Sequence, residues 1–192
     1  MPSEVSICNQ ALGWVGGNLI TSLDDGTTEA NLCKANYASL RDAVLEDRDW
    51  TFATARKLLT PLADDPVFGW TRQMQLPSDN IRVIGCWALD RDEDQEQADY
   101  VKEGRRILSN EPKLNLKYIR RIVAPEDFSA GFTQALAARI AADIAIPIAQ
   151  SRALQEDMQA LYMKKLSDAG TNDGMQGRSE KKLSTKMLRS RV

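Results

Sequence analysis

Adjacent carboxylates are the residues of this chain whose type and spacing come nearest to a catalytic pattern. Examples are Asp24 with Asp25, Asp64 with Asp65, and Asp92 with Asp94, which are separated by one residue. Two acids at a set separation are what a glycan hydrolase needs, one to donate a proton and one to act as base or nucleophile. Acidic pairs are common in loops, however, and nothing in the sequence fixes their geometry. We therefore expect no catalytic residues.

Histidine is absent, and the cysteines are not paired in the sequence. Without histidine in 192 residues, a histidine-based triad, a histidine–metal site and imidazole acid–base catalysis are all excluded. Cys8, Cys33 and Cys86 lie far apart, without the close spacing of a metal site or a disulfide framework. We expect no metal and no cofactor, and three free cysteines that are buried as small apolar side chains in a reducing cytoplasm.

Charge is distributed unevenly along the chain. The formal net charge is −2 at pH 7, but residues 175–192 contain six bases and one acid, which leaves −7 on the remainder. An acidic body with a basic end indicates that the end is an interaction segment. A nonspecific nucleic-acid arm and a purely disordered tail are the two other interpretations of this segment.

Hydrophobic periodicity predicts helices at both ends of the chain and strands between them. Helices are expected over 3–15, 27–47, 126–146 and 151–168. Short aromatic and aliphatic runs separated by turn residues indicate a β-rich insertion over 50–122. The predicted fold class is therefore α+β, a mainly helical bundle of about four helices with an inserted antiparallel β-rich lobe. This forms one domain over 1–170, and 171–192 is an extended, flexible C-terminal tail.

The helix over 27–47 is the element around which we expect the rest to be organised. Asp25 or Thr27 can serve as its N-cap. Its apolar stripe consists of Ala30, Cys33, Tyr37, Leu40 and Val44. The opposite face carries Lys34, Arg41, Asp42, Glu46 and Asp47, and this face meets either water or a neighbouring subunit.

The helix over 126–146 is expected to be the central one of the bundle, because small residues on several of its faces allow close approach. Pro125 and the following acids open it, and Pro147 kinks or ends it. No apolar run is expected to reach the ~20 residues of a membrane span. The aromatic residues Trp14, Trp50, Phe52, Trp70 and Trp87 are expected to pack within the core or the β lobe, not to form a ligand site.

Several stretches together resemble the head-to-tail adaptor family of tailed bacteriophages, of the tail tubular protein A or gatekeeper type. The stretches are NQALGWVGG, ITSLDD, YASLRD, RDWTFATARKLL and GWTRQMQLPSDNIRVIG. Two features carry the resemblance: a helix that ends in the aromatic step Trp50, Phe52 and Ala53, and a leucine–proline turn formed by Leu76, Pro77 and Asp79. The resemblance covers roughly residues 7–165 and is specific over the first ninety.

The resemblance implies a structural virion protein that is not an enzyme. It would form a ring, a dodecamer, between the portal protein and the tail nozzle or tail tube protein, assembled in the host cytoplasm. DNA would pass through the ring without specific binding. The acidic turn would line the channel or form an ordinary solvated hairpin tip, and its residues are Asp90, Asp92, Glu93, Asp94 and Glu96. The basic end would dock on the portal through Arg178, Lys181, Lys182, Lys186, Met187, Leu188, Arg189 and Arg191.

Two other functions are compatible with the sequence. One is a carboxylate-based glycan hydrolase associated with the tail, which would use one of the acidic pairs. The other is a helical adaptor of non-viral origin, which would share the docking role of the basic end. A ring adaptor should assemble into particles far larger than the 21.4 kDa chain, whereas a hydrolase would lose activity on a single Asp→Asn substitution.

Overall fold

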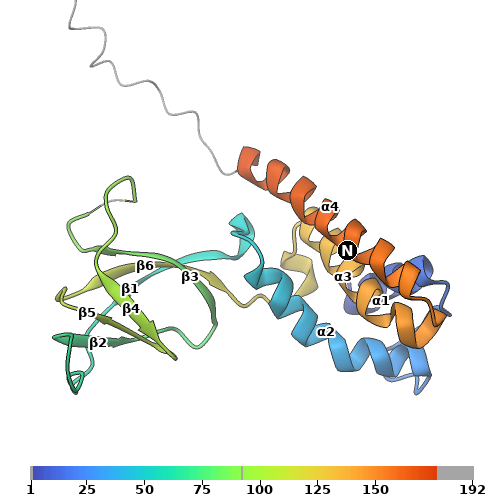
Figure 1. The fold of residues 1–192 in the computed structure, drawn as a ribbon, viewed down its shortest axis with the longest axis horizontal. Helices are drawn as coiled ribbons and strands as arrows, with labels where there is room; N and C mark the ends of the chain where they lie inside the picture. The colour runs from blue at the N-terminus through green and yellow to red at the C-terminus, as the bar shows by residue number, and fades with distance from the viewer. Residues whose placement is uncertain (1, 92, 177–192) are drawn as a thin grey trace, which may run out of the picture.

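The computed structural model describes residues 2–91 and 93–176, with side chains as far as Thr171. Within these residues a bundle of four α-helices lies at one end of the molecule, and a lobe of two three-stranded sheets lies at the other (Figure 1). This confirms the predicted α+β class, with the β-rich lobe inserted between the second and third helices. The extended C-terminal tail of the prediction lies mainly outside the described residues.

The first two helices begin and end at the residues that their sequence indicates. Helix α1, Glu4–Val15, begins with a capping box between Ser3 and Ser6 and ends at Gly16, whose φ of 74° is the left-handed conformation that glycine favours. Helix α2, Thr28–Glu46, is capped by Thr27, whose side chain accepts a hydrogen bond from the Ala30 amide. The predicted apolar stripe of α2 is buried throughout.

Helix α3, Ala130–Ala149, is placed correctly at the centre of the bundle, but its predicted bounds of 126–146 are wrong. Pro125–Asp127 form a separate short 3-10 turn, and Ser129 caps α3 by accepting from the Phe132 amide. The helix continues through Pro147, because a proline in the last turn removes only one intrahelical hydrogen bond. It ends instead at Gln150, which adopts the left-handed conformation and donates its amide to the Ile146 carbonyl at 2.9 Å.

By length and composition alone, α3 is the one helix in the described part of the chain that could cross a membrane. Its two charged residues, Arg139 and Asp143, lie one turn apart with 4.0 Å between their nitrogen and oxygen atoms. The helix packs against α1, α2 and α4, and its buried residues belong to the shared core. Its packing is that of the central helix of a bundle.

Helix α4, Arg152–Gln176, is longer than the predicted 151–168. The sequence indicated an end near Gly170, but the helix continues past this glycine. A Cβ atom at position 170 would lie 1.4 Å from Cζ of Arg48, so the absence of a side chain makes room for that guanidinium. Arg48 also donates from Nη1 to the Leu166 carbonyl at 3.0 Å. Gly170 is therefore a packing position and not a helix end.

Both sheets of the lobe are antiparallel. The first has the order β1-β6-β3, with β1 at Thr54–Leu59, β6 at Leu114–Arg120 and β3 at Asn80–Ala88. The second has the order β2-β5-β4, with β2 at Arg72–Gln75, β5 at Arg106–Ser109 and β4 at Tyr100–Glu103. A single bridge between Pro61 and Met74 links the segment after β1 to β2. All six strands fall within the predicted insertion 50–122.

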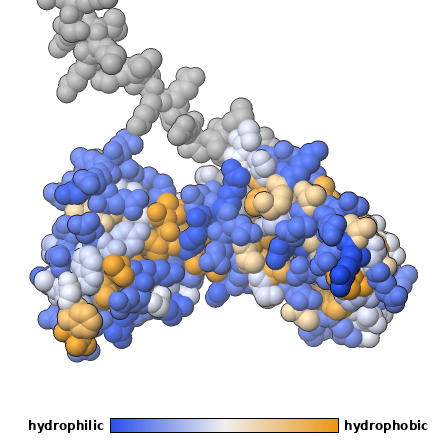
Figure 2. Space-filling model, viewed as in Figure 1, coloured by the Kyte–Doolittle hydropathy of each residue, from blue (hydrophilic) through white to orange (hydrophobic). Residues whose placement is uncertain are grey.

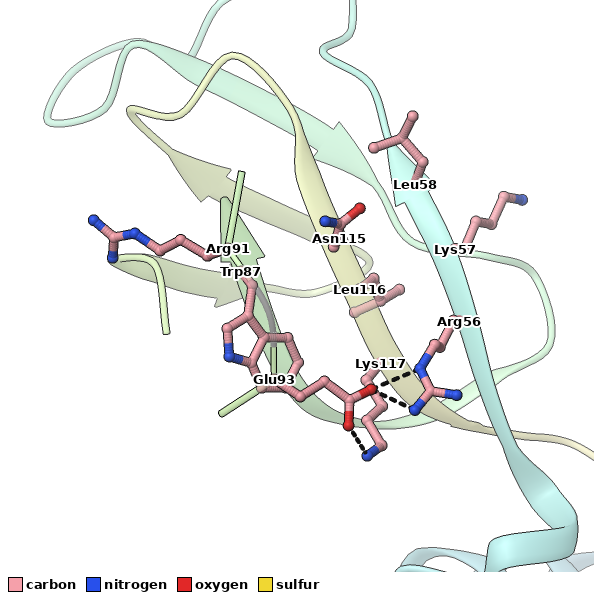
Figure 3. A pocket seen from close by; sticks show the side chains of 9 residues that line it. All are labelled: Arg56, Lys57, Leu58, Trp87, Arg91, Glu93, Asn115, Leu116 and Lys117. Carbon is pink, nitrogen blue, oxygen red and sulfur yellow. Dashed lines mark hydrogen bonds and ion pairs between the residues drawn. The ribbon is translucent and has the colours of Figure 1, made fainter. Parts of the chain in front are cut away.

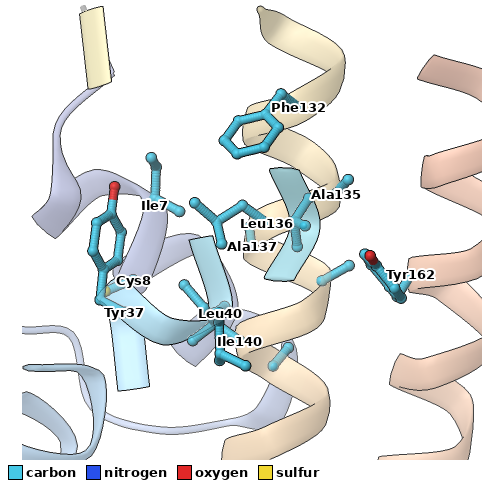
Figure 4. Packing of buried hydrophobic residues seen from close by; sticks show 14 of the residues in the cluster. Ile7, Cys8, Tyr37, Leu40, Phe132, Ala135, Leu136, Ala137, Ile140 and Tyr162 are labelled. Carbon is cyan, nitrogen blue, oxygen red and sulfur yellow. The ribbon is translucent and has the colours of Figure 1, made fainter. Parts of the chain in front are cut away.

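Two apolar cores result. The helical core is centred on α3 and includes Phe132, Leu136 and Ile140, with Ile7 and Tyr37 from the first two helices (Figure 4). The lobe core lies within the β lobe and consists of Leu59, Met74, Leu76, Cys86, Ala98, Ile107, Leu114, Leu116 and Tyr118. Strand β6 contributes to both, since Tyr118 belongs to the lobe core and Ile119 to the helical core.

Candidate functional site

Residues 42–49, at the C-terminal end of α2 and just after it, connect α2 to the β lobe and to helix α4. Asp42 accepts from Nε of Arg121, just after β6, at 2.8 Å. Asp47 accepts from the Tyr162 hydroxyl of α4, and Asp49 pairs with Arg82 of β3. These three aspartates thus connect α2 and the residues just after it to the β lobe and to α4.

The charged face of α2 is only partly outward, which corrects the expectation that all of it meets water or a partner. Arg41 is just 6% exposed and is held by Oδ1 of Asp42 at 2.7 Å. Asp47 and Asp42 are engaged within the chain as described above. Lys34 and Glu46 are exposed, and Lys34 pairs with Asp24 at 2.6 Å. A subunit contact made by this face would therefore involve its N-terminal half and Glu46.

The aromatic step after α2 is structural. The Trp50 indole is fully buried and donates from Nε1 to the Val44 carbonyl at 2.8 Å. Its ring meets Phe132 edge-on with 5.1 Å between centroids, and Phe52 and Phe128 complete the cluster. This confirms the expected packing role of Trp50 and Phe52.

A pocket of about 320 Å³ lies on the sheet that contains β1, β6 and β3 (Figure 3). We refer to it as the sheet pocket. Its lining residues are Arg56, Lys57, Leu58, Trp87, Arg91, Glu93, Asn115, Leu116 and Lys117. Four of the nine are basic and one is acidic, so the pocket is positive although the chain as a whole is negative.

Strand register brings the basic residues of the sheet pocket together. Arg56 of β1 is paired directly with Lys117 of β6, and like charges in that position repel each other. Glu93, from the loop after β3, relieves this repulsion. It accepts from Nε of Arg56 at 2.6 Å and from Nζ of Lys117 at 2.7 Å. The hydrogen bond from Lys117, with that from Arg56, holds the pKa of the Glu93 carboxyl below its usual value.

Trp87 forms an aromatic part of the pocket lining because Gly85 leaves room for it. A Cβ atom at position 85 would lie 2.6 Å from the Trp87 ring and 2.8 Å from the Gln97 amide. The indole donates from Nε1 to the Gln95 carbonyl at 3.2 Å, which fixes the loop against the sheet. The sequence reasoning treated Trp87 as packing only. The signal it missed was the alternation of Gly85 with Trp87 on one face of a strand.

The acidic turn proposed as a channel lining is only partly available for that role. Asp90, Asp94 and Glu96 are exposed. The charge of Glu93 is balanced by two bases of the sheet pocket, and sequence reasoning did not foresee this contact. Asp92 lies outside the described residues.

The docking residues proposed at the C-terminus all lie outside the described residues. These are Arg178, Lys181, Lys182, Lys186, Met187, Leu188, Arg189 and Arg191. The structure does describe the helix that precedes them. Gly131 in the first turn of α3 lies against Ala169 of α4. Beyond this contact, residues 170–176 continue α4 for about 10 Å, at ~1.5 Å per residue.

The acidic pair Asp24 and Asp25 has structural partners. Asp25 accepts from the amides of Thr21 and Ser22 at 2.7 and 3.0 Å, and these hydrogen bonds, that from Ser22 foremost, lower the pKa of its carboxyl. Asp64 and Asp65 are exposed in the loop after β1. In the described part of the chain, no three histidine, cysteine or acidic side chains are grouped so that they could hold a metal ion.

The three cysteines are free and buried, which confirms that part of the prediction. A hydrogen bond with Cys33, together with burial, raises the pKa of the Cys8 thiol above its usual range. Burial alone raises the pKa of Cys86 to about 12. The Cys8 and Cys86 thiols are therefore protonated at neutral pH and are poor nucleophiles.

No family model matches the chain, and no curated protein matches its sequence.

Proposed function

We propose that this protein is a structural subunit of a tailed-phage virion, a head-to-tail adaptor that forms a ring between the portal and the tail tube or nozzle. The observation that carries the proposal is the position of the adaptor-like residues in the fold. Trp50, Phe52 and Ala53 lie where α2 passes into β1, at the joint between the bundle and the β lobe. The packing of Trp50 and Phe52 against Phe132 of α3 joins the bundle to the segment that leads into the β lobe.

The second adaptor-like stretch also has a structural role. The Pro77 carbonyl accepts from Nη2 of Arg105 at 2.9 Å, which ties the turn before β3 to the β4–β5 turn. The Asp79 carbonyl accepts from the Arg121 amide at 2.7 Å, and its carboxylate accepts from the Tyr118 hydroxyl at 3.3 Å. Leu76 is buried in the lobe core. Both stretches thus support the assignment to a protein that works through its shape.

The charge distribution supports the same role. A conduit for DNA should repel phosphate, because each lysine–phosphate contact would add salt-dependent affinity and slow passage. The remainder of the chain carries −7, and the basic residues are concentrated in 175–192. Helix α4 leads directly into this basic end, which would suit docking on a preformed portal surface.

Assembly with the portal tests this proposal. The purified chain should form collar-shaped particles with portal rings by negative-stain microscopy; a dodecamer would add about 257 kDa, twelve times the 21.4 kDa chain. Deleting residues 177–192 should abolish portal binding while far-UV circular dichroism is retained, since the deletion leaves Arg152–Gln176 of α4 in place. A chain in which the residues of 177–192 are reordered keeps the charge and serves as the matched control. Portal rings that never bind the full chain would refute the adaptor role.

A further inference from the structure

The loop between β1 and β2 presents two apolar side chains to solvent. Val67 is 97% exposed and Phe68 is 85% exposed, and we refer to them together as the apolar tip. Figure 2 shows hydrophobic residues at the end of the β lobe where this loop lies in Figure 1. Single exposed apolar residues are common, but two adjacent ones at the tip of a loop form a ready-made contact for another surface.

The loop that carries the apolar tip is held at its base. The Leu62 amide donates to the Gln73 carbonyl, and the Gln73 side chain donates to the Asp64 carbonyl, each at 2.8 Å. On the other side, the Thr71 amide donates to Oδ1 of Asn110 at 3.1 Å. A loop fixed in this way has already lost part of its conformational entropy, so binding through its tip costs less.

The sheet pocket has the size and lining to receive the apolar tip. Its volume of about 320 Å³ lies at the small end of ligand pockets, large enough for an aromatic side chain. Leu116 and Trp87, which are 1% and 7% exposed, form the apolar floor of the pocket, and contact between Phe68 and the accessible part of the Trp87 ring would add to simple burial. Leu58 is itself 45% exposed, which leaves apolar surface at the pocket uncovered in the single chain.

Charge complementarity identifies the occupant as a second copy of this chain. Two exposed acids, Asp64 and Asp65, precede the apolar tip in its loop. The sheet pocket is lined by bases, of which Arg91 carries charge that Glu93 does not balance, and Lys57, whose side chain points away from the pocket in Figure 3, adds positive charge nearby. An acidic loop with an apolar tip therefore matches a basic pocket with an apolar lining in both size and sign.

We propose that the apolar tip of one copy inserts into the sheet pocket of the next copy. The two surfaces are different patches of the β lobe, one on the β1–β2 loop and the other on the sheet of β1, β6 and β3, so the contact is head-to-tail. A head-to-tail contact closes into a ring when its rotation allows and otherwise extends into a filament. The inference deepens the proposed function, because it names the contact between subunits of the ring, and it rests on that function only for the closure of the ring.

Sedimentation of full-length variants tests the contact. Replacing both Val67 and Phe68 by serine removes the tip, and Leu58→Trp fills the pocket from an exposed strand position. Each should weaken self-association roughly thirtyfold, as expected for a central contact residue. Leu19→Ser is the matched control, because Leu19 is 68% exposed but belongs to the bundle. It should associate like the wild type, and circular dichroism should show all variants folded.

A mixture of the two variants gives the sharper result. The tip variant retains an intact pocket and the pocket variant an intact tip, so a head-to-tail contact allows them to form dimers and nothing larger. Self-association of the tip or pocket variant at wild-type strength would overturn the inference while leaving the adaptor role intact if portal binding persists. Loss of portal binding in the pocket variant alone, with normal self-association, would mean that a portal segment fills the pocket, and would also overturn it. Wild-type self-association that both variants lose, without any portal binding, would support the contact and refute the adaptor role.

Discussion

Replacing Gly131 by alanine should destabilise the protein, although helix propensity alone predicts that alanine is more stable than glycine within a helix. Gly131 lies in the first turn of α3, where a Cβ atom would be 2.7 Å from Cβ and 3.2 Å from Cα of Ala169 in α4. The neighbour is close to the backbone and cannot swing away as a long side chain can. Gly131→Ala should therefore force α3 and α4 apart.

The expected magnitude follows from two opposing effects. Overpacking of this kind costs about 1–3 kcal/mol. Replacing a helical glycine by alanine returns at most about 1 kcal/mol, and less in a first turn. The free energy of unfolding should fall by about 1–2 kcal/mol. The matched control is Gly13→Ala in α1, where no atom lies within 4 Å of the new Cβ, and there we expect a gain of about 0.5–1 kcal/mol.

Urea denaturation followed by far-UV circular dichroism measures both changes. A third variant, Ala169→Gly, removes the atom at 2.7 Å, so combining it with Gly131→Ala should cost less than the two single changes added together. Equal stabilisation by alanine at positions 131 and 13 would refute the close approach of α3 and α4 and with it the path that α4 takes out of the bundle.

Three further predictions concern the joint, the sheet pocket and the cysteines. Trp50→Phe should lower the free energy of unfolding by about 2–4 kcal/mol, because it leaves the buried Val44 carbonyl without its donor and opens a cavity; urea denaturation checks this, and a loss under 1 kcal/mol would contradict it. Glu93→Gln should be less stable than the wild type at neutral pH; because the folded-state pKa of Glu93 is lowered, this deficit should vanish as the pH falls through that pKa, and thermal melts from pH 7 to 3 would show a constant deficit if the ion pairs do not form. Cys86, whose pKa burial raises to about 12, should not react with a thiol reagent at pH 8 until denaturant is added, and the same holds for the two other buried cysteines; labelling of the native protein followed by mass spectrometry would reveal any exposed thiol.

The fold class was predictable because it depends on local patterns. The apolar stripe of α2 and the caps Ser3 and Thr27 are written in adjacent residues, and the structure confirms them. The predicted helix ends at Pro147 and Gly170 are wrong for different reasons, because the proline lies in a last turn that tolerates it and the glycine makes room for a distant side chain. Both residues usually end a helix, but at Gly170 the guanidinium of Arg48, more than a hundred residues away, decides the outcome.

The sheet pocket could not be predicted from the sequence, because it depends on strand register. Arg56 and Lys117 meet only because β1 and β6 pair in one particular alignment, and Glu93 reaches both from a loop after β3. The apolar tip was more accessible to sequence reasoning. Val67 and Phe68 lie between Pro66 and Gly69, and two apolar residues flanked by such turn-forming residues are a local sign of an exposed contact.

The double role of β6 has a consequence for how this protein could be divided or recombined. The β lobe is inserted in the sequence like a portable unit, but Ile119 at the end of its middle strand is fully buried among the helices. An isolated 50–122 fragment would expose Ile119, Trp50 and Ala53 to solvent. The bundle left without these three side chains would have a cavity in its core. Neither half is therefore a transferable module, and the chain should melt in one cooperative step.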